Sequence, residues 1–303
     1  MITDLVALDI FRTVAQEGSV TRAAERLGRA QSGVTTRIQQ LEEQLGCTLF
    51  VREGRRLALS PAGSTLLTYA EQLLALAEQA RQALHPSQPQ GRLRLGAMES
   101  TAAARLPQPL AQLHARWPQL VIELRTAPSA PLVEQVLAHQ LDAALVAWPP
   151  PGLDDDAGLV RTPVFDEELL LALPATHAPL RRPGDLQLDT LAAFSHGCTY
   201  RRLGEDWMRQ ARGAPPQVLE LASYPAILAC VAAGRCAGVV PRAMVEQLRE
   251  PPALQWVALG RCTTELVARA GHDTPALQAL RAALLALAGS VGAPASLTDD
   301  DRT

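Results

Sequence analysis

The chain has 303 residues, of which 48% are hydrophobic and 19% charged, a composition that excludes a largely disordered protein. No apolar run reaches the roughly 20 residues that a membrane helix needs, and Asp4 and Asp9 do not fit an export signal, so we expect a cytoplasmic protein with no membrane partner. The net charge is −3 and all 28 basic residues are arginine, so whole-chain charge does not indicate a nucleic-acid ligand.

The N-terminal residues predict three short helices. Apolar residues recur at helical spacing over residues 5–15, and Gly18-Ser19 ends this helix and caps the next. Gly28 ends the second helix, and a third helix follows and closes at Gly46. We therefore expect a helix-turn-helix, although a three-helix core with solvated polar faces has the same pattern.

Positive charge gathers at this motif. Between residues 20 and 40 four arginines accompany a single acidic residue, Glu25, which favours a local contact with phosphates over a merely solvated helix face. The third helix carries polar side chains that can read base edges, and the arginines can position the protein on the DNA backbone. The residues that we expect at DNA are Thr21, Arg22, Arg29, Gln31, Ser32, Thr35, Thr36, Arg37, Arg52, Arg55 and Arg56.

A wing and a long helix are predicted next. Residues 47–60 predict two short strands around Glu53-Gly54, with arginines at the tip that suit the flanking backbone or the minor groove. Ser60-Pro61 predicts the start of a helix over residues 61–85. Its apolar residues have coiled-coil spacing and predict a homodimer, which implies an inverted-repeat DNA site. The predicted dimer seam consists of Leu66, Ala70, Leu73, Ala77, Ala80 and Leu84.

The remaining two thirds of the chain predict an α/β domain. Residues 86–91 form a polar, Pro-containing hinge, beyond which short apolar strands alternate with helical segments, as in a mostly parallel sheet. The predicted strands are 92–98, 120–126, 141–147, 169–174, 217–221 and 237–240.

Hydroxyl residues follow several of these strands where a helix begins. Ligands of such sheets bind at the carboxyl ends of strands, where helix N-termini favour a small anion. For each residue alone a plain helix cap is the favoured interpretation, but their joint occurrence after successive strands makes Ser100-Thr101, Ser129, Thr199 and Ser223 candidate effector contacts.

The sequence contains no catalytic motif and no spacing of residues that is typical of a metal site. The five cysteines are odd in number and scattered, and the six histidines lack metal-ligand spacing. No phosphate loop, Gly-x-Ser-x-Gly elbow or His-Glu-x-x-His motif is present. We expect free thiols, no metal, no cofactor and no enzymatic activity.

Three segments together resemble the LysR-type transcriptional regulators: LDIFRTVAQEGSVTRAAERL, QSGVTTRIQQLEEQLG and TLFVREGRRLALSPAG. The match is ordered and nearly gapless over residues 5–84. The resemblance implies a winged helix-turn-helix over residues 1–60, a linker helix and a two-lobed effector domain similar to periplasmic binding proteins over residues 92–292, with a flexible tail at 293–303. It also implies a homotetramer that contacts RNA polymerase.

By the family pattern, one lobe comprises residues 92–163 and 264–292 and the other residues 164–263, with LDAALVAWP as the first crossover strand and TELVARAG as the second. The expected effector contacts between the lobes are Ser100, Thr101, Ser129, Cys198, Thr199, Tyr200 and Ser223.

The sequence departs from the family at Ala30 and Gly33, where Ser and Ala are usual. A missing cap oxygen costs roughly 1 kcal/mol and a helix-interior glycine roughly 0.5–1 kcal/mol, so we expect a loose first turn in the third helix.

Cys198 offers an alternative function. Its position at a helix start would lower the pKa of the thiol, and related peroxide sensors use a cysteine in a similar loop. The next cysteine is Cys230, farther away than the resolving cysteine of those sensors, so a steric or ligand-contact role is favoured. The prediction is a DNA-binding regulator that responds to a small, anionic effector; the alternatives are redox sensing through Cys198 and a constitutive DNA-binding protein without ligand control.

Overall fold

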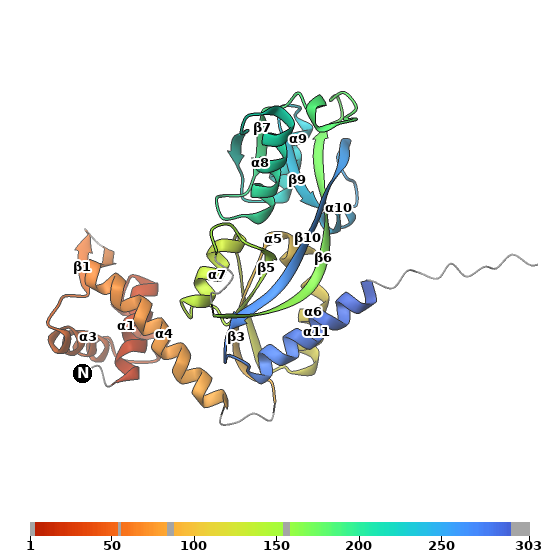
Figure 1. Cartoon of the computed structure of the whole chain (residues 1–303). Helices are drawn as coiled ribbons and strands as arrows, with labels where there is room; N and C mark the ends of the chain where they lie inside the picture. Colours follow the sequence, from red (N-terminus) through yellow and green to blue (C-terminus); the bar gives the residue numbers. More distant parts are fainter. Residues whose placement is uncertain (1–3, 54–55, 84–87, 154–157, 292–303) are drawn as a thin grey trace, which may run out of the picture. The chain divides into compact units, whose positions relative to one another are not determined.

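A computed structural model describes residues 4–53, 56–83, 88–153 and 158–291. Apart from residues 138–140, which group with the first unit, the chain divides into two compact units between residues 85 and 86 (Figure 1). The predicted tail at 293–303, the first two residues of the predicted hinge, Arg55 of the wing and Leu84 of the seam lie outside the described residues.

The first unit is a winged helix-turn-helix, as predicted. Helices α1 (Leu5–Glu17), α2 (Val20–Leu27) and α3 (Gln31–Leu45) precede a hairpin of β1 (Phe50–Glu53) and β2 (Arg56–Leu59), which leads into the long α4 (Pro61–Ala83). The predicted glycine stops are confirmed: Gly18, Gly28 and Gly46 end the three short helices with φ of 58°, 63° and 67°. This left-handed conformation suits glycine because it has no Cβ.

The core of this unit collects the apolar faces of the helices, and α4 contributes Leu66 and Ala70 to it. The junction before α4 depends on Ser60 and Gly63. The Ser60 hydroxyl donates to the Thr48 carbonyl (2.6 Å) and accepts from the Gly63 N–H (2.9 Å), which caps the helix as predicted. A Cβ at Gly63 would overlap with the Leu49 carbonyl oxygen. The glycine of the Ser-Pro-Ala-Gly sequence is thus required by this close approach.

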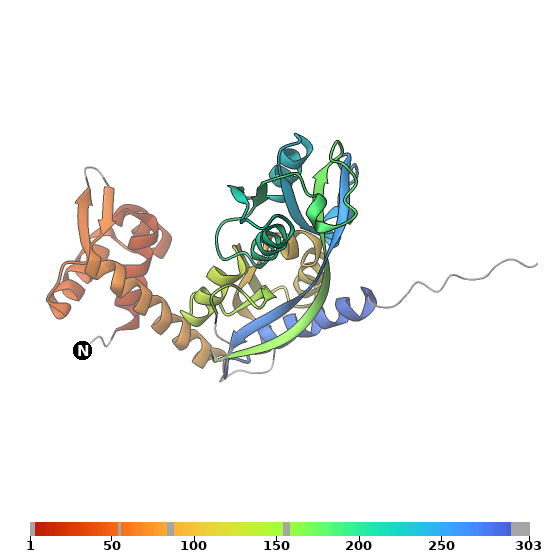
Figure 2. The same cartoon turned by 45° about the horizontal axis from the view of Figure 1, so that its top comes forward.

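The second unit is built on a mixed sheet that has eight strands in the described part of the chain (Figure 2). Pairs near the two edges are parallel, and antiparallel pairs occur where β6 or β10 takes part. In their order across the sheet, the strands are β4 (Leu120–Thr126), β3 (Gly91–Ala97), β5 (Ala143–Trp148), β10 (Leu254–Arg269), β6 (Leu159–Pro174), β9 (Ala237–Pro241), β7 (Thr190–Ala193) and β8 (Gln217–Glu220).

Helices cover both faces of this sheet. Alternate residues of β5 illustrate the two layers, because Ala143 and Leu145 pack with α6 and α11, whereas Ala144 and Val146 pack with α7. In the other half, α8 and α9 cover opposite faces in the same way. The helices of this unit are α5 (Glu99–Ala104), α6 (Pro107–Arg116), α7 (Ser129–Leu137), α8 (Thr199–Arg212), α9 (Tyr224–Ala232), α10 (Arg242–Glu246), α11 (Pro275–Val291) and the short η1 (Pro183–Asp185).

Two strands of 16 residues each, β6 and β10, run side by side from one half of the sheet to the other (Figure 1). The prediction that TELVARAG belongs to a crossover strand is confirmed by β10. The prediction for LDAALVAWP is wrong, because this segment forms β5, an interior strand of the first half whose residues 143–147 are fully buried. We call the two halves the first lobe (β3–β5, α5–α7 and α11) and the second lobe (β7–β9 and α8–α10).

Candidate functional site

The outward face of α3 is polar and accessible. Gln31, Ser32, Thr35 and Thr36 are exposed, whereas Val34 on the opposite face is fully buried. The Thr35 hydroxyl donates to the Gln31 carbonyl at 3.1 Å, so its methyl group rather than its O–H is left to contact a ligand. Helix α3 can therefore present side chains to the edges of bases.

The first turn of α3 lacks the stabilising groups that helix starts commonly have. Ala30 occupies the N-cap position and makes no side-chain cap hydrogen bond, whereas Ser19 caps α2 by accepting from the Arg22 N–H. Gly33 has open space where a Cβ would stand. The departures at both positions thus fall where a cap oxygen and a methyl group would stabilise the helix.

The predicted DNA-binding arginines differ in their freedom. Arg29 and Arg52 are exposed, as is Thr21. Arg22 donates to the Glu17 carbonyl, and Arg37 forms an ion pair of 3.4 Å with Asp4. Arg55 and the side chain of Arg56 are not among the parts of the chain that the structure describes. Because exposed ion pairs are weak, Arg22 and Arg37 can still exchange these partners for phosphates.

One carboxylate connects α3 to the wing. Glu42 Oε1 accepts hydrogen bonds from the backbone N–H of Leu49 (2.6 Å) and Phe50 (3.3 Å). The sequence interpretation assigned Glu42 no role, and its place in the Leu-Glu-Glu-x-Leu-Gly end of α3 was the only signal. This contact sets the position of the wing relative to α3.

The predicted dimer seam on α4 is wrong for two of its residues. Leu66 and Ala70 belong to the core of their own unit and are 9% and 0% exposed. The exposed apolar stripe of α4 consists instead of Tyr69, Leu73, Leu76 and Ala80, of which Leu73 and Ala80 were predicted. The other predicted member with a described side chain, Ala77, is half-buried.

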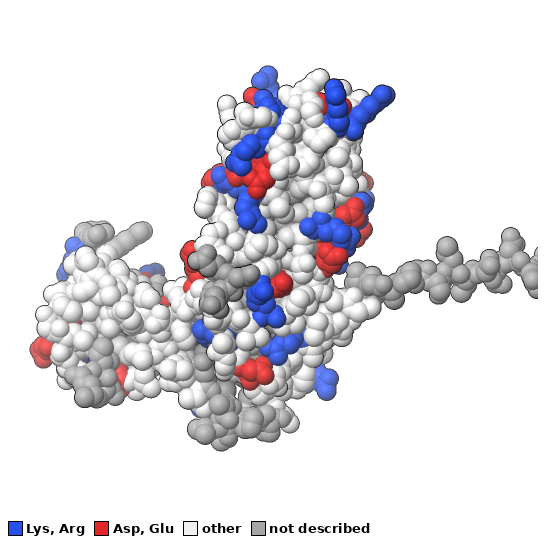
Figure 3. All heavy atoms as spheres, in the orientation of Figure 1, with Lys and Arg blue, Asp and Glu red and all other residues white. Residues whose placement is uncertain are grey.

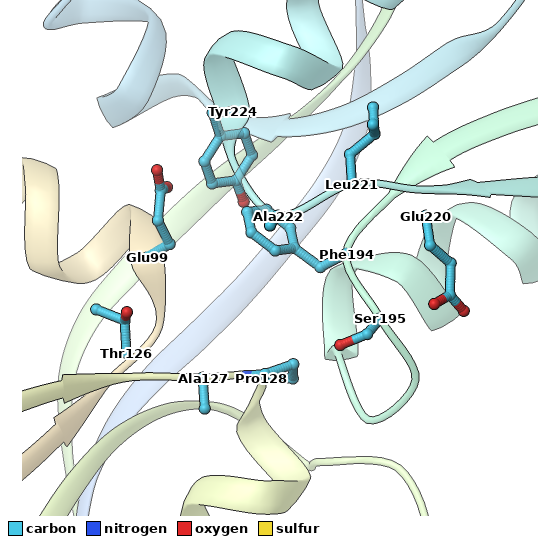
Figure 4. A pocket seen from close by; sticks show the side chains of 10 residues that line it. All are labelled: Glu99, Thr126, Ala127, Pro128, Phe194, Ser195, Glu220, Leu221, Ala222 and Tyr224. Carbon is cyan, nitrogen blue, oxygen red and sulfur yellow. The ribbon is translucent and has the colours of Figure 1, made fainter.

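The second unit contains a cavity of about 470 Å³. This volume is within the range of small-molecule sites, roughly 300–1,000 Å³. Figure 4 shows Glu99 and Thr126 on one side of the cavity and Ser195 and Glu220 on the other. Both lobes contribute to the lining. The first lobe supplies Glu99, Thr126, Ala127 and Pro128, and the second supplies Phe194, Ser195, Glu220, Leu221, Ala222 and Tyr224.

None of the seven predicted effector contacts lines this cavity, although Ser100, Ser129 and Ser223 each adjoin a residue in the chain that does. Ser100, Thr101, Ser129 and Thr199 are buried. Ser129 and Thr199 bond the backbone of Ala147: the Ala147 N–H donates to Ser129 Oγ (3.2 Å), and Thr199 Oγ1 donates to the Ala147 carbonyl (3.0 Å). These hydroxyls join elements of the fold rather than face a ligand.

The predicted role of helix cap holds for one of these residues. Ser223 caps α9 by accepting from the Ala226 N–H at 3.4 Å. The N-cap positions of α5 and α8 are instead Met98 and Cys198, which make no side-chain cap bond. Cys198 and Tyr200 line a void of only about 10 Å³ behind Phe194 and Tyr224.

The expected direction of the Cys198 pKa shift is wrong. Burial is the dominant influence and raises the pKa of the thiol, against smaller opposing effects of backbone N–H groups and Arg201. A thiol whose pKa is raised carries less of the reactive thiolate at neutral pH. All five cysteines are free. Redox sensing through Cys198 is therefore disfavoured.

The charged groups of the cavity wall are carboxylates. Glu220 forms an ion pair of 2.6 Å with Arg201, whereas Glu99 is half-buried and its pKa is raised by burial, partly offset by a hydrogen bond from the Tyr224 N–H. Elsewhere on this unit arginines and acidic residues also pair, as in Arg242 with Glu168 at 2.7 Å, and Figure 3 shows such side chains next to one another.

Sequence models of two protein domains match almost the whole chain. Residues 5–64 match "Bacterial regulatory helix-turn-helix protein, lysR family", and residues 86–289 match "LysR substrate binding domain". The chain belongs to the LysR family. It is therefore a DNA-binding transcriptional regulator with an effector-binding domain, and not an enzyme, as predicted.

Relatives in this family span most of the chain. The transcriptional regulator GltR of Bacillus subtilis is 37% identical over 78% of this chain and 79% of its own length, and YusT of the same organism is 34% identical over 86% and 88%. SoxR of Arthrobacter sp. is 32% identical over 80% and 81%.

Solved LysR-family structures share the fold. A single-residue variant of full-length OxyR from Pseudomonas aeruginosa aligns with a TM-score of 0.69 at 23% identity over 94% of this chain and 95% of its own. CbnR in complex with its target DNA aligns with a TM-score of 0.65 at 22% identity over 93% and 99%.

The part of the chain that the structure describes contains neither a membrane-spanning helix nor a cluster of metal-binding side chains. No helix there is long and apolar enough to cross a bilayer, and no group of three or more His, Cys, Asp or Glu side chains among the described residues could hold a metal ion.

Proposed function

We propose that this LysR-family regulator binds an inverted-repeat operator as a homodimer and that a small molecule in the cavity of the second unit controls its response. The observation that carries the proposal is the cavity of about 470 Å³ whose wall combines residues of both lobes. A ligand that contacts both lobes stabilises the arrangement of the lobes that fits it best. Its binding energy is then available to shift the DNA-binding equilibrium.

The DNA contact is assigned to the outward face of α3. Gln31, Ser32 and Thr36 are the candidate base-reading residues, with Thr35 contributing its methyl group. Arg29 and Arg52, with Arg55 and Arg56 of the wing, are assigned to phosphates or the minor groove. The structure of the relative CbnR with its target DNA supports this use of the fold.

The exposed stripe of Tyr69, Leu73, Leu76 and Ala80 is the proposed dimer contact of α4. A dimer places two α3 helices on half-sites about 34–36 Å apart, or a multiple of that distance. Assembly of two dimers into a tetramer and a contact with RNA polymerase at the promoter complete the proposal, in keeping with the match of residues 5–64 to the LysR-family helix-turn-helix.

The test begins with operators selected from a random DNA pool by the full chain, mapped on the source genome. Fluorescence anisotropy then measures operator binding with and without compounds from a metabolite collection. A second measurement uses Ala222→Trp, which fills the cavity from an exposed wall position. We expect this variant to bind operator as the wild type does and to lose the response to active compounds. If no compound changes operator binding or thermal stability, the protein is a constitutive DNA-binding regulator and ligand control is wrong.

A further inference from the structure

The charge of the cavity wall conflicts with the expectation of an anionic ligand. Glu99 and Glu220 are the charged members of the described lining, which contains no arginine or histidine. Glu220 is exposed and its charge is compensated by Arg201 at 2.6 Å. The uncompensated charge of the wall is therefore the negative charge of Glu99.

The N-termini of α7 and α9 next to the cavity offer few donors to offset this charge, because most of their first amides are already in use. At α9, the Tyr224 N–H donates to Glu99, Pro225 has no N–H, and the Ala226 N–H donates to the Ser223 hydroxyl. At α7, the Ala130 N–H donates to the Gly197 carbonyl at 3.0 Å, and Pro131 has no N–H. An anion would find few free donors at these helix starts.

Glu99 itself lacks a cationic partner. Among the described residues no arginine or histidine forms an ion pair with it, and its Oε2 atom is shielded from solvent without a hydrogen-bond partner. A shielded carboxylate oxygen with no donor is costly. A donor that enters with a ligand would remove this cost, and a positively charged donor would remove most of it.

Aromatic side chains stand beside this carboxylate. The rings of Phe194 and Tyr224 are 5.0 Å apart in an edge-to-face arrangement, and both line the cavity with Glu99 (Figure 4). Aromatic faces attract ammonium groups and also pack against hydrocarbon. The rest of the wall is largely apolar, with Ala127, Pro128, Leu221 and Ala222.

We propose that the effector of this regulator is a small organic cation, an amine that is protonated at neutral pH, whose ammonium group binds Glu99 beside Tyr224 and Phe194 while its carbon skeleton fills the apolar part of the cavity. This inference rests on the proposed ligand control and replaces the anionic effector that the sequence predicted. Burial raises the pKa of Glu99 in the ligand-free protein, and a bound cation would lower this pKa again because it favours the charged carboxylate.

The test uses the full chain and matched sets of simple probes. Benzylamine, n-butylamine and putrescine are the cations; benzyl alcohol, n-butanol and 1,4-butanediol are their neutral counterparts; benzoate, butyrate and succinate are the anions. Thermal melts and calorimetric titration give stabilisation and affinity. At ten times its dissociation constant, an amine that binds should raise the Tm by roughly 3–5 °C, and its neutral and anionic counterparts should not.

Two isosteric variants locate the effect. Glu99→Gln keeps an acceptor for the Tyr224 N–H but removes the charge, and it should weaken amine binding about 10- to 100-fold, as expected for loss of a charged hydrogen bond. The matched control is Glu123→Gln on β4, a half-buried position paired with Arg92 outside the cavity, which should bind amines as the wild type does.

The outcomes separate this inference from ligand control as such. If anions or neutral compounds stabilise the protein and change operator binding while the amines do not, control by a ligand stands and the cationic effector is wrong. Amine binding that Glu99→Gln leaves unchanged would also overturn the assignment. If none of the nine probes and no compound of the metabolite collection has an effect, both proposals are wrong.

Discussion

Thr199, at the start of α8, donates a hydrogen bond of 3.0 Å to the carbonyl of Ala147 at the end of β5, and so joins the second lobe to the first. The Thr199 side chain is only 1% exposed. The Thr199→Val substitution keeps the shape and removes the donor. We expect it to lower the stability of this unit by about 1 kcal/mol, a Tm decrease of roughly 2–4 °C in a thermal melt. Thr199→Ser keeps the hydroxyl, so its Tm should decrease less than that of Thr199→Val. Equal Tm values for the wild type and Thr199→Val would refute the role of this bond.

Gly33 and Gly28 make a matched pair for testing the start of α3. Neither has an atom within 4 Å of a would-be Cβ, but only Gly28 has a positive φ, of 63°. Gly33→Ala should therefore stabilise the first unit by about 0.5–1 kcal/mol, whereas Gly28→Ala should destabilise it by about 1–2 kcal/mol. Hydrogen exchange of the α3 amides and chemical denaturation measure the effects. Equal protection of the first turn and the centre of α3 in the wild type would contradict the loose start.

Two substitutions separate base reading from phosphate contact. Gln31→Ala should reduce discrimination between operator and random DNA by about 1–3 kcal/mol, because it removes a base-reading side chain. Arg29→Ala should weaken binding to both DNAs alike and lower the slope of log affinity against log salt concentration by about 1. Anisotropy titrations at several salt concentrations give both quantities. Equal losses on the two DNAs for Gln31→Ala would remove Gln31 from the base-reading set.

Leu76, 55% exposed on α4, tests the revised dimer contact. A glutamate at this position would place a charge in the apolar stripe, and we expect Leu76→Glu to raise the dimer dissociation constant at least about tenfold. Sedimentation equilibrium measures the assembly. The control, Thr68→Glu, adds the same charge at an exposed position of the same helix outside the stripe and should leave the dimer intact. A stable dimer of Leu76→Glu would show that α4 pairs through another face.

The raised pKa of Glu99 predicts a pH-dependent stability of the ligand-free protein. A carboxyl whose pKa is higher in the folded than in the unfolded state favours folding at pH values below the unfolded pKa, and this contribution is lost as the pH rises through the folded pKa. Glu99→Gln should therefore melt at a higher temperature than the wild type at pH 7, with a smaller difference near pH 4. Thermal melts from pH 4 to 8 measure this, and a difference independent of pH would argue against it.

Local patterns predicted the first unit well because its signals are local. The helix stops at Gly18, Gly28 and Gly46 depend on a backbone conformation that glycine favours, and the Ser60 cap depends on a hydroxyl next to Pro61. The dimer seam failed because coiled-coil spacing does not tell which face of α4 packs on its own unit. Leu66 and Ala70 fit the spacing and yet fill the core.

In the second unit the predicted effector contacts missed the cavity by one or a few residues. Ser100 is buried where Glu99 lines the cavity, and Ser223 caps α9 where Tyr224 lines it. Adjacent side chains on a helix point about 100° apart, so the rotation of each helix decides which of the two faces the ligand. That rotation is set by tertiary packing, as is the route of β6, whose first five residues are largely exposed and do not alternate between apolar and polar side chains.

The bonds of Glu42 to the amides of Leu49 and Phe50 also bear on how this protein can evolve toward new operators. These bonds, together with the packing of Phe50, Leu57 and Leu59 on the core that contains α3, fix the spacing between α3 and the wing, so that spacing does not adjust independently to a DNA whose minor groove lies elsewhere. Substitutions on the outward face of α3 can alter the bases that are read without altering the distance to the next groove. New specificity is then acquired within a fixed footprint, and a change of footprint requires a change at Glu42 or in the wing itself.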